Sequence, residues 1–97
     1  MHVVSKSRLA KFWNDYPASK AALDGWLRLA RKHDFLNFAE LKSIFGTVDQ
    51  VGRLSVFDIG GNKYRLIAAI HFNRQKIFVR AIMRHVDYDK GKWRTDL

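Results

Sequence analysis

The sequence predicts a single α+β domain, residues 1–97, in which an N-terminal helix pair packs on a small, mainly antiparallel β-sheet. Three observations carry this prediction. Apolar residues recur at helical spacing between Leu9 and Ala30, two β-type runs follow each other between residues 63 and 84, and turn signals separate the runs. With 97 residues, 47% of them apolar, the chain can bury about two thirds of its unfolded surface.

The N-terminal third is expected to hold one strand and the helix pair. Met1 to Val4 is short and apolar, which fits a first strand or the edge of a sheet. Ser5 or Ser7 can cap the following helix, and Pro17 ends it. A second helix is expected from Ser19 to His33. The apolar stripes of the two helices are Leu9, Phe12, Trp13 and Tyr16, then Ala22, Leu23, Trp26, Leu27 and Ala30.

A short third helix and a strand should follow. Asn37-Phe38-Ala39-Glu40 resembles a capping box, and the helix after it is expected to end at Gly46. Its inward residues would be Leu41, Ile44 and Phe45. Thr47 to Gly52 is predicted to be a loop, and Leu54 to Ile59 a strand.

Gly60-Gly61 is predicted to be a hairpin turn that sets Asp58 opposite Lys63, and Phe57 opposite Tyr64. If Asn73-Arg74 is the next hairpin loop, Phe72 faces Gln75. The apolar face then pairs Ile70/Ile77, Ala68/Val79, Leu66/Ala81 and Tyr64/Met83, while the other face pairs His71/Lys76, Ala69/Phe78, Ile67/Arg80, Arg65/Ile82 and Lys63/Arg84. We prefer this register because a one-residue slip would place Arg65 among apolar residues.

This register gathers basic residues on one face of the sheet. Arg65 and Arg80 become diagonal neighbours on the order of 7 Å apart. Lys63 and Arg84 face each other, which disfavours the sheet unless an anion lies between them. Guanidinium groups suit a phosphate, although either arginine taken alone fits a solvated surface side chain equally well. Phe78 lies on the same face, where it could be covered by other parts of the chain or stack on a base.

The formal charge of +9 favours a nucleic-acid or other polyanionic partner. A basic protein that is merely soluble, or that binds an acidic protein, also fits this charge. The chain has no cysteine, which excludes disulfides and cysteine-type zinc sites. Its four histidines lack ligand spacing, so no metal and no other cofactor are expected.

No apolar run approaches transmembrane length, and residues 1–5 lack the long apolar segment of a signal peptide. A soluble cytoplasmic protein without a membrane partner is therefore expected.

The segment after the last predicted strand, His85-Val86-Asp87-Tyr88-Asp89-Lys90, supplies acid/base groups. RNA carries its own nucleophile, the 2′-OH. A ribonuclease without a metal therefore needs only a proton acceptor, a proton donor and cations around the phosphorane. His85 titrates in the useful range, and Tyr88 or a lysine could assist. From these residues alone, a capping or core role for His85 and a packing role for Tyr88 are slightly preferred.

Several motifs together resemble the HigB-type toxins of the RelE-like superfamily, and the resemblance covers nearly the whole chain. They are Met1-His2-Val3-Val4, Tyr16-Pro17, Leu41-Lys42-Ser43-Ile44-Phe45, the stretch from Phe57 to Leu66 with its G-G-N-x-x-R-L pattern, Ile77-Phe78-Val79-Arg80, and the H-x-x-Y-D pattern beginning at His85.

The resemblance implies a ribosome-dependent mRNA endonuclease that needs no metal and leaves a 2′,3′-cyclic phosphate. It implies as partners the mRNA on the ribosome and a cognate HigA-type antitoxin, a DNA-binding helix-turn-helix protein. By position, Arg65 and Arg80 would stabilise the phosphate, while His85 and Tyr88 would transfer protons in an order that stays open. Lys63 and Lys90 would be auxiliaries. The basic face of the predicted hairpin adds Arg84, Lys76 and Phe78 as RNA-binding candidates.

Two other functions remain open at this point. One is a non-catalytic RNA- or ribosome-binding module, and the other is an inactive toxin that only binds an antitoxin.

Overall fold

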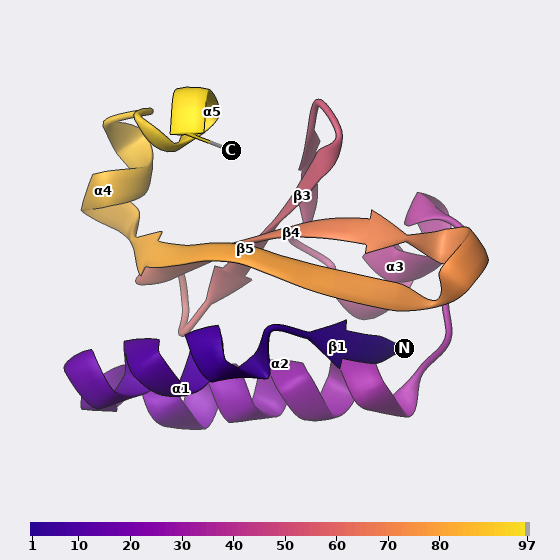
Figure 1. Cartoon of the computed structure of the whole chain (residues 1–97), viewed down its shortest axis with the longest axis horizontal. Helices are drawn as coiled ribbons and strands as arrows, with labels where there is room; N and C mark the ends of the chain where they lie inside the picture. The colour runs from indigo at the N-terminus through magenta and orange to yellow at the C-terminus, as the bar shows by residue number, and fades with distance from the viewer. Residues whose placement is uncertain (97) are drawn as a thin grey trace.

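The computed structural model, which describes residues 1–96, places two helices against one face of a five-stranded sheet and a helical tail against the other (Figure 1). The strand order is β1-β5-β4-β3-β2. Strand β1 pairs with β5 in parallel, and the remaining neighbours are antiparallel. The strands are β1 (His2–Val4), β2 (Asp49–Val51), β3 (Leu54–Ile59), β4 (Tyr64–His71) and β5 (Lys76–Arg84). The predicted α+β class is therefore confirmed.

The predicted helices are present, and two more form in the tail. They are α1 (Lys6–Asp15), α2 (Lys20–Lys32), α3 (Phe38–Ile44), α4 (His85–Asp89) and α5 (Trp93–Asp96). The Asn37 side chain caps α3 by accepting a 3.0 Å hydrogen bond from the Glu40 backbone N–H, as the sequence predicts. Ser5 lies at the cap position of α1 but makes no side-chain cap bond. Ile44 is 39% exposed, so its predicted inward position is wrong.

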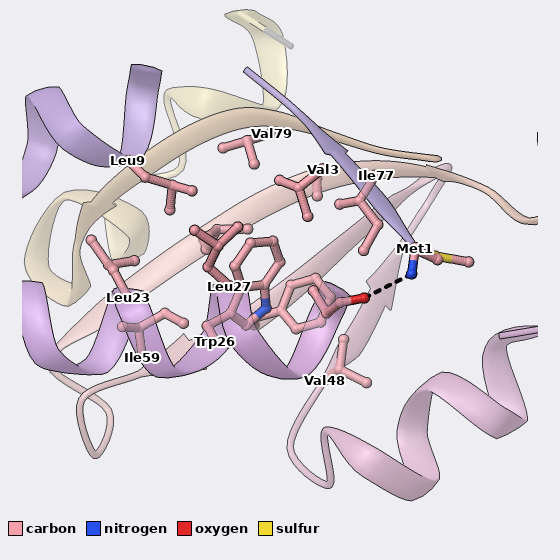
Figure 2. Packing of buried hydrophobic residues seen from close by; sticks show 14 of the residues in the cluster. Met1, Val3, Leu9, Leu23, Trp26, Leu27, Val48, Ile59, Ile77 and Val79 are labelled. Atoms are coloured by element: carbon pink, nitrogen blue, oxygen red, sulfur yellow. Dashed lines mark hydrogen bonds between the residues drawn. The ribbon is translucent and has the colours of Figure 1, made fainter. Parts of the chain in front are cut away.

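The main core lies between α1, α2 and the sheet, and Figure 2 shows its packing. Leu9, Leu23 and Leu27 of the helices are at most 3% exposed, as their spacing predicts. They meet the sheet residues Leu66, Ala68, Ile77 and Val79. The aromatic residues predicted to be core, Phe12, Trp13, Trp26, Phe45, Phe57 and Phe72, all belong to this cluster or pack against it.

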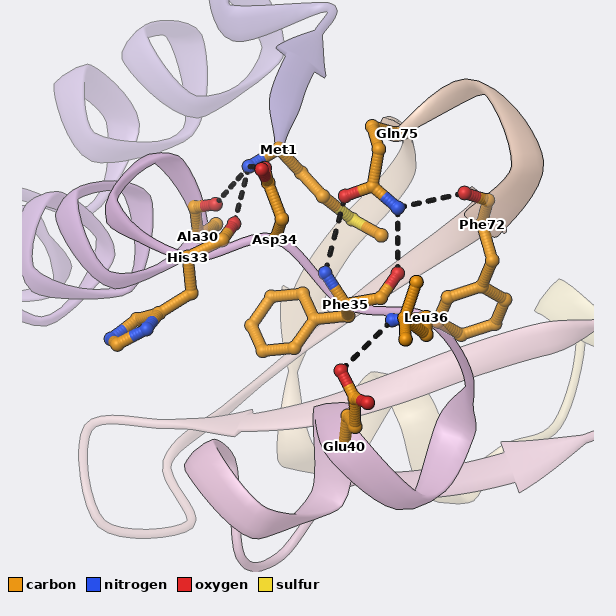
Figure 3. Close-up of polar contacts among 9 residues, drawn as sticks. All are labelled: Met1, Ala30, His33, Asp34, Phe35, Leu36, Glu40, Phe72 and Gln75. Carbon is orange, nitrogen blue, oxygen red and sulfur yellow. Dashed lines mark hydrogen bonds and ion pairs between the residues drawn. The ribbon is translucent and has the colours of Figure 1, made fainter.

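Polar contacts attach the α2–α3 connection to the N-terminus and to the β4–β5 turn of the sheet (Figure 3). The Met1 ammonium donates a 2.9 Å hydrogen bond to the Ala30 carbonyl near the end of α2. The Gln75 side chain accepts from the Phe35 N–H at 3.1 Å, and donates to the carbonyl oxygens of Phe35 and Phe72 at 2.7 Å each. These bonds satisfy backbone groups at the β4–β5 turn and hold it in place.

The predicted β4–β5 register is correct near the turn and wrong beyond it. The pairs from His71↔Lys76 to Ala68↔Val79 are as predicted. A register shift follows, because Ile67 pairs with Ala81 and Arg80 is left as the extra residue of a β-bulge. The observed pairs beyond it are Leu66↔Ile82, Arg65↔Met83 and Tyr64↔Arg84. Ile82 therefore packs against the main core, while Ala81 and Met83 face the other side.

The predicted β3–β4 register is also wrong. The turn is longer than two glycines: Ile59 pairs with Tyr64, and Asp58 pairs with Arg65 instead of Lys63. Gly60, Gly61 and Asn62 all adopt positive φ angles between 63° and 77°, which glycine and asparagine tolerate best. The predicted loop from Thr47 to Gly52 contains strand β2, which pairs with β3.

Candidate functional site

The C-terminal tail covers one end of the sheet face that lies opposite α1 and α2 (Figure 1). Helix α4 begins directly after β5, and the backbone N–H of His85 donates a 2.9 Å hydrogen bond to the Lys63 carbonyl. Trp93, the first residue of α5, is 5% exposed and packs with Val56 and Ile67 in a second, smaller cluster. The tail residues of the predicted site are thus attached to the sheet.

Arg65 lies under this tail and is almost completely buried, with 9% of its surface exposed. Its Nε is 3.1 Å from a carboxylate oxygen of Asp58. Its Nη1 donates to the carbonyl oxygens of Asn62 and Tyr64 at 3.4 and 3.2 Å, and its Nη2 donates to the Asn62 side-chain oxygen. The protein itself therefore engages most of the guanidinium group.

Tyr88 connects Arg65 to the end of the tail. The guanidinium carbon of Arg65 lies 5.4 Å from the centroid of the Tyr88 ring. Trp93 stacks on the same ring, with centroids 5.0 Å apart and planes 14° apart. The Trp93 indole N–H also donates a 3.0 Å hydrogen bond to the Tyr88 carbonyl. These contacts fix the position of the Tyr88 ring on the sheet.

His85 lies one turn before Tyr88 and is partly exposed, with 38% of its side chain accessible. Its Nδ1 is shielded from solvent and lies 3.1 Å from an Asp89 carboxylate oxygen, in a geometry that forms no hydrogen bond. The pair becomes an ion pair when the imidazole is protonated.

Exposed charges surround the start of the tail. Arg84 donates two hydrogen bonds to the Asp87 carboxylate, from Nε at 2.9 Å and from Nη2 at 3.3 Å. This bonding raises the pKa of Arg84 and lowers the pKa of Asp87 below its usual value. The ammonium of Lys90 is 3.9 Å from the same carboxylate. The predicted facing pair of Lys63 and Arg84 is not formed, because Arg84 pairs with Tyr64.

We call Asp58, Asn62, Arg65, His85, Tyr88 and Trp93 the tail cluster. Arg80 lies outside this cluster and is exposed on the β-bulge. The predicted diagonal pairing of Arg80 with Arg65 is wrong, because the bulge places Arg65 opposite Met83 instead of Ile82. Arg80 instead borders a depression on the uncovered end of the sheet face. The other residues that line this depression are Val51, Arg53, Leu54, Ala69, Ile70 and His71.

The other predicted RNA-binding residues are dispersed along the sheet. Phe78 is half-buried and meets the His71 ring edge-to-face, with centroids 5.0 Å apart. Lys76 pairs with His71 at the turn end, while Lys63 is exposed at the tail end. The structure thus brings Arg65, His85 and Tyr88 together and leaves Arg80, Lys76 and Phe78 on the uncovered part of the face.

Sequence reasoning missed three residues of the tail cluster: Asp58, Asn62 and Trp93. The wrong hairpin register assigned Asp58 to Lys63, so its pairing with Arg65 was not expected. The G-G-N pattern did include Asn62, and a longer turn would have pointed to its side chain. Trp93 lies beyond the recognised motifs.

Among the side chains that the structure describes, no group of three or more histidine, cysteine or acidic residues is arranged to hold a metal ion. None of the described helices combines the length and apolarity needed to cross a membrane.

Comparison with known proteins identifies the family. A family model described as HigB_toxin, a RelE-like toxic component of a toxin–antitoxin system, matches residues 19–91. The mRNA interferase HigB of Escherichia coli O6:H1 is 33% identical over 93 residues, which cover 93% of this chain and 90% of the relative. The mRNA interferase toxin HigB of Escherichia coli K12 is 32% identical over 92 residues, covering 92% of this chain and 88% of the relative. The chain therefore belongs to the HigB family of RelE-like toxins of toxin–antitoxin systems.

Proposed function

We propose that this toxin is an endoribonuclease that cuts mRNA on the ribosome and thereby inhibits translation. One observation carries the proposal. Tyr88 and His85 stand on a short helix that is anchored to the sheet, at the edge of a face that carries exposed cations. The relatives named mRNA interferase make RNA the preferred polyanion.

The proposed reaction uses the 2′-OH of the RNA as nucleophile. A base accepts the 2′-OH proton while the 2′-oxygen bonds to phosphorus, and an acid donates a proton to the departing 5′-oxygen. The products are a 2′,3′-cyclic phosphate and a 5′-OH. Because the RNA supplies the nucleophile and side chains transfer the protons, this reaction needs no metal or other cofactor. His85 and Tyr88 are our candidates for the two proton transfers.

Exposed cations would stabilise the charge that builds up on the phosphate. Arg80 is suited to this role, since its guanidinium makes no ion pair or side-chain hydrogen bond within the described chain. Arg84 directly precedes the tail and Lys90 lies within it, but both are close to the carboxylate of Asp87. Lys63, Lys76 and Phe78 would guide the flanking RNA along the face.

Cleavage of ribosome-bound mRNA by His85→Gln and Tyr88→Phe variants tests the proposal. We expect each variant to slow cleavage by about 10² to 10⁴-fold, the usual effect of losing an acid or base. The products of the unmodified protein should carry 2′,3′-cyclic ends. Matched controls are His2→Gln and Tyr16→Phe, which change exposed residues on β1 and beside α1.

If neither variant slows cleavage, the proton-transfer groups lie elsewhere. If the protein binds translating ribosomes without producing any cyclic end, the function is RNA binding alone. The exposed Arg53 and Arg80 at the uncovered depression favour that second function. The affinity of such a non-catalytic protein for RNA would fall steeply with added salt.

Membership of the family also implies an antitoxin partner. We propose that this partner is a HigA-type protein with a DNA-binding helix-turn-helix domain. Co-expression should then yield a complex that lacks mRNA-cleaving activity and binds DNA. A complex that does not bind DNA would contradict this assignment of the partner.

A further inference from the structure

We propose that Arg65 positions Tyr88 and the tail, with Asp58 and Asn62 as its supports, and does not bind the scissile phosphate. The inference rests on the proposed function for its cleavage readout, while its structural part stands independently. It makes Asp58, Asn62 and Arg65 a positioning unit for the Tyr88 ring.

The hydrogen bonds of Arg65 argue against a phosphate as its partner. A guanidinium binds a phosphate best through two adjacent N–H groups that lie on one edge. On one edge, Nε faces Asp58 at 3.1 Å and Nη2 is bonded to the Asn62 side chain. The other edge consists of Nη1 and Nη2. There, Nη1 donates to two carbonyl oxygens and Nη2 to the Asn62 side chain. Each edge would have to break a contact within the protein before it could bind a phosphate.

Charge and burial lead to the same conclusion. The Asp58 carboxylate offsets the positive charge of Arg65 and would repel an approaching phosphate. The Arg65 side chain is only 11% exposed, whereas that of Asp58 is 32% exposed. A phosphate at this place would therefore meet the anion more readily than the cation. Arg80, by contrast, is exposed and has no such carboxylate partner among the described residues.

The contacts of Arg65 reach three parts of the chain that form the tail site. Asp58 belongs to β3, Asn62 to the β3–β4 turn and Tyr88 to α4. The same turn accepts the His85 backbone N–H through the Lys63 carbonyl. Arg65 thus fixes the Tyr88 ring relative to the β3–β4 turn, to which the first residue of α4 is hydrogen-bonded. A displacement of about 1 Å at a reacting group can cost about 100-fold in rate.

The decisive variant is Asp58→Ala, because the two roles predict opposite outcomes. If Arg65 positions the tail, losing its support should slow cleavage of ribosome-bound mRNA by about 100-fold. Cleavage decides between the two roles, because removing a carboxylate tightens RNA binding in either case. Asp58→Asn, which keeps the side-chain volume and an acceptor oxygen, should fall between Asp58→Ala and the unmodified protein. If Arg65 binds phosphate, freeing it from Asp58 should tighten RNA binding without loss of cleavage, and that result would overturn the proposal.

The salt dependence of RNA binding separates the two arginines. Arg80→Met should reduce the slope of log affinity against log salt by about 0.7, the value for one phosphate contact on a single strand. Arg65→Met should leave the slope unchanged. An equal reduction in the two variants would show that Arg65 also contacts a phosphate.

Amide hydrogen exchange tests the positioning unit without any cleavage assay. Amides of residues 85–95 should exchange faster in Asp58→Ala and Arg65→Met, and at the unmodified rate in Arg80→Met, while β3–β5 stay protected in all three. Unchanged protection of the tail in both variants would overturn the proposal. If the tail loosens as expected but the unmodified protein does not cut mRNA, the proposed function fails and the positioning unit stands.

Discussion

The two faces of the sheet are covered in different ways. The face against α1 and α2 carries a large apolar core in which residues from both helices and four strands are almost fully buried. Between the tail and the face that it covers, Val56 and Ile67 of the sheet and Trp93 of the tail are the only buried apolar residues of the second cluster in the part of the chain that the structure describes. There, a buried arginine and a tyrosine–tryptophan stack fill the space that apolar side chains fill on the other face.

This difference assigns separate tasks to the two faces. Burial of apolar surface contributes most of the stability of a small domain, so the helix face holds the fold together. The tail face buries little and depends on a few directional contacts. Such regions open locally at a lower free energy than the whole domain. The candidate acid/base groups therefore stand on the less stable part of the molecule, where contacts and not bulk burial determine their position.

The greatest loss of stability is expected from a substitution on the helix face. Phe57 is 1% exposed and packs edge-to-face against Trp26 and Phe45. Phe57→Ala should lower the free energy of unfolding by about 3–5 kcal/mol, because it removes buried surface and leaves a cavity. Denaturant titration measures this loss. Leu36→Ala is the control, since Leu36 is 76% exposed and its removal should change the stability little.

A loss for Phe57→Ala no larger than that for Leu36→Ala would mean that the helix face does not dominate the stability of the domain.

Much of this helix face could be predicted from the sequence. The apolar spacing located α1 and α2, and the capping pattern at Asn37 located the start of α3. These signals are local, and the periodicity of an amphipathic helix repeats over several turns. One misplaced residue therefore does not change the prediction.

The tail face could not be predicted in the same way, because its geometry depends on single-residue offsets. Ala81, Ile82 and Met83 are all apolar, so the pattern after the bulge at Arg80 fits either register. Because the β3–β4 turn has four residues instead of two, the cross-strand partner of Asp58 is Arg65 and not Lys63. Family motifs indicated Arg65 and Tyr88 as site residues, but neither motif nor pattern indicated that they contact each other.

A smaller effect is expected on the tail face from Trp93→Phe. This variant keeps an aromatic ring against Tyr88 but removes the indole N–H that bonds to the Tyr88 carbonyl. A hydrogen bond of this kind contributes about 1 kcal/mol, so the tail amides should exchange about fivefold faster. Hydrogen exchange read by mass spectrometry resolves this change.

The matched control is Trp13→Phe on α1, where the tryptophan packs against the helix-face core. It should leave exchange in the tail unchanged. Equal acceleration of tail exchange in the two variants would mean that the faces are coupled, which would contradict the separation of tasks.

The smallest effect is expected from the Arg84–Asp87 pair, because both side chains are open to solvent. The hydrogen bonds from Arg84 lower the pKa of Asp87 in the folded protein below its ordinary value of 3.8. A group with a lowered pKa stabilises the folded state above its unfolded pKa, and this contribution is lost as the pH falls through the folded pKa. An NMR titration of the Asp87 carboxyl should therefore show a midpoint below 3.8 that rises in Arg84→Met.

Protection of the tail amides in Asp87→Asn should match that of the unmodified protein near pH 7, because the buried stack of Arg65, Tyr88 and Trp93 holds the tail and this surface pair adds little. A large loss of protection in Asp87→Asn would mean that surface charge orders the tail. The position of Tyr88 would then depend on an ion pair that added salt weakens, and the activity of the toxin would follow ionic strength.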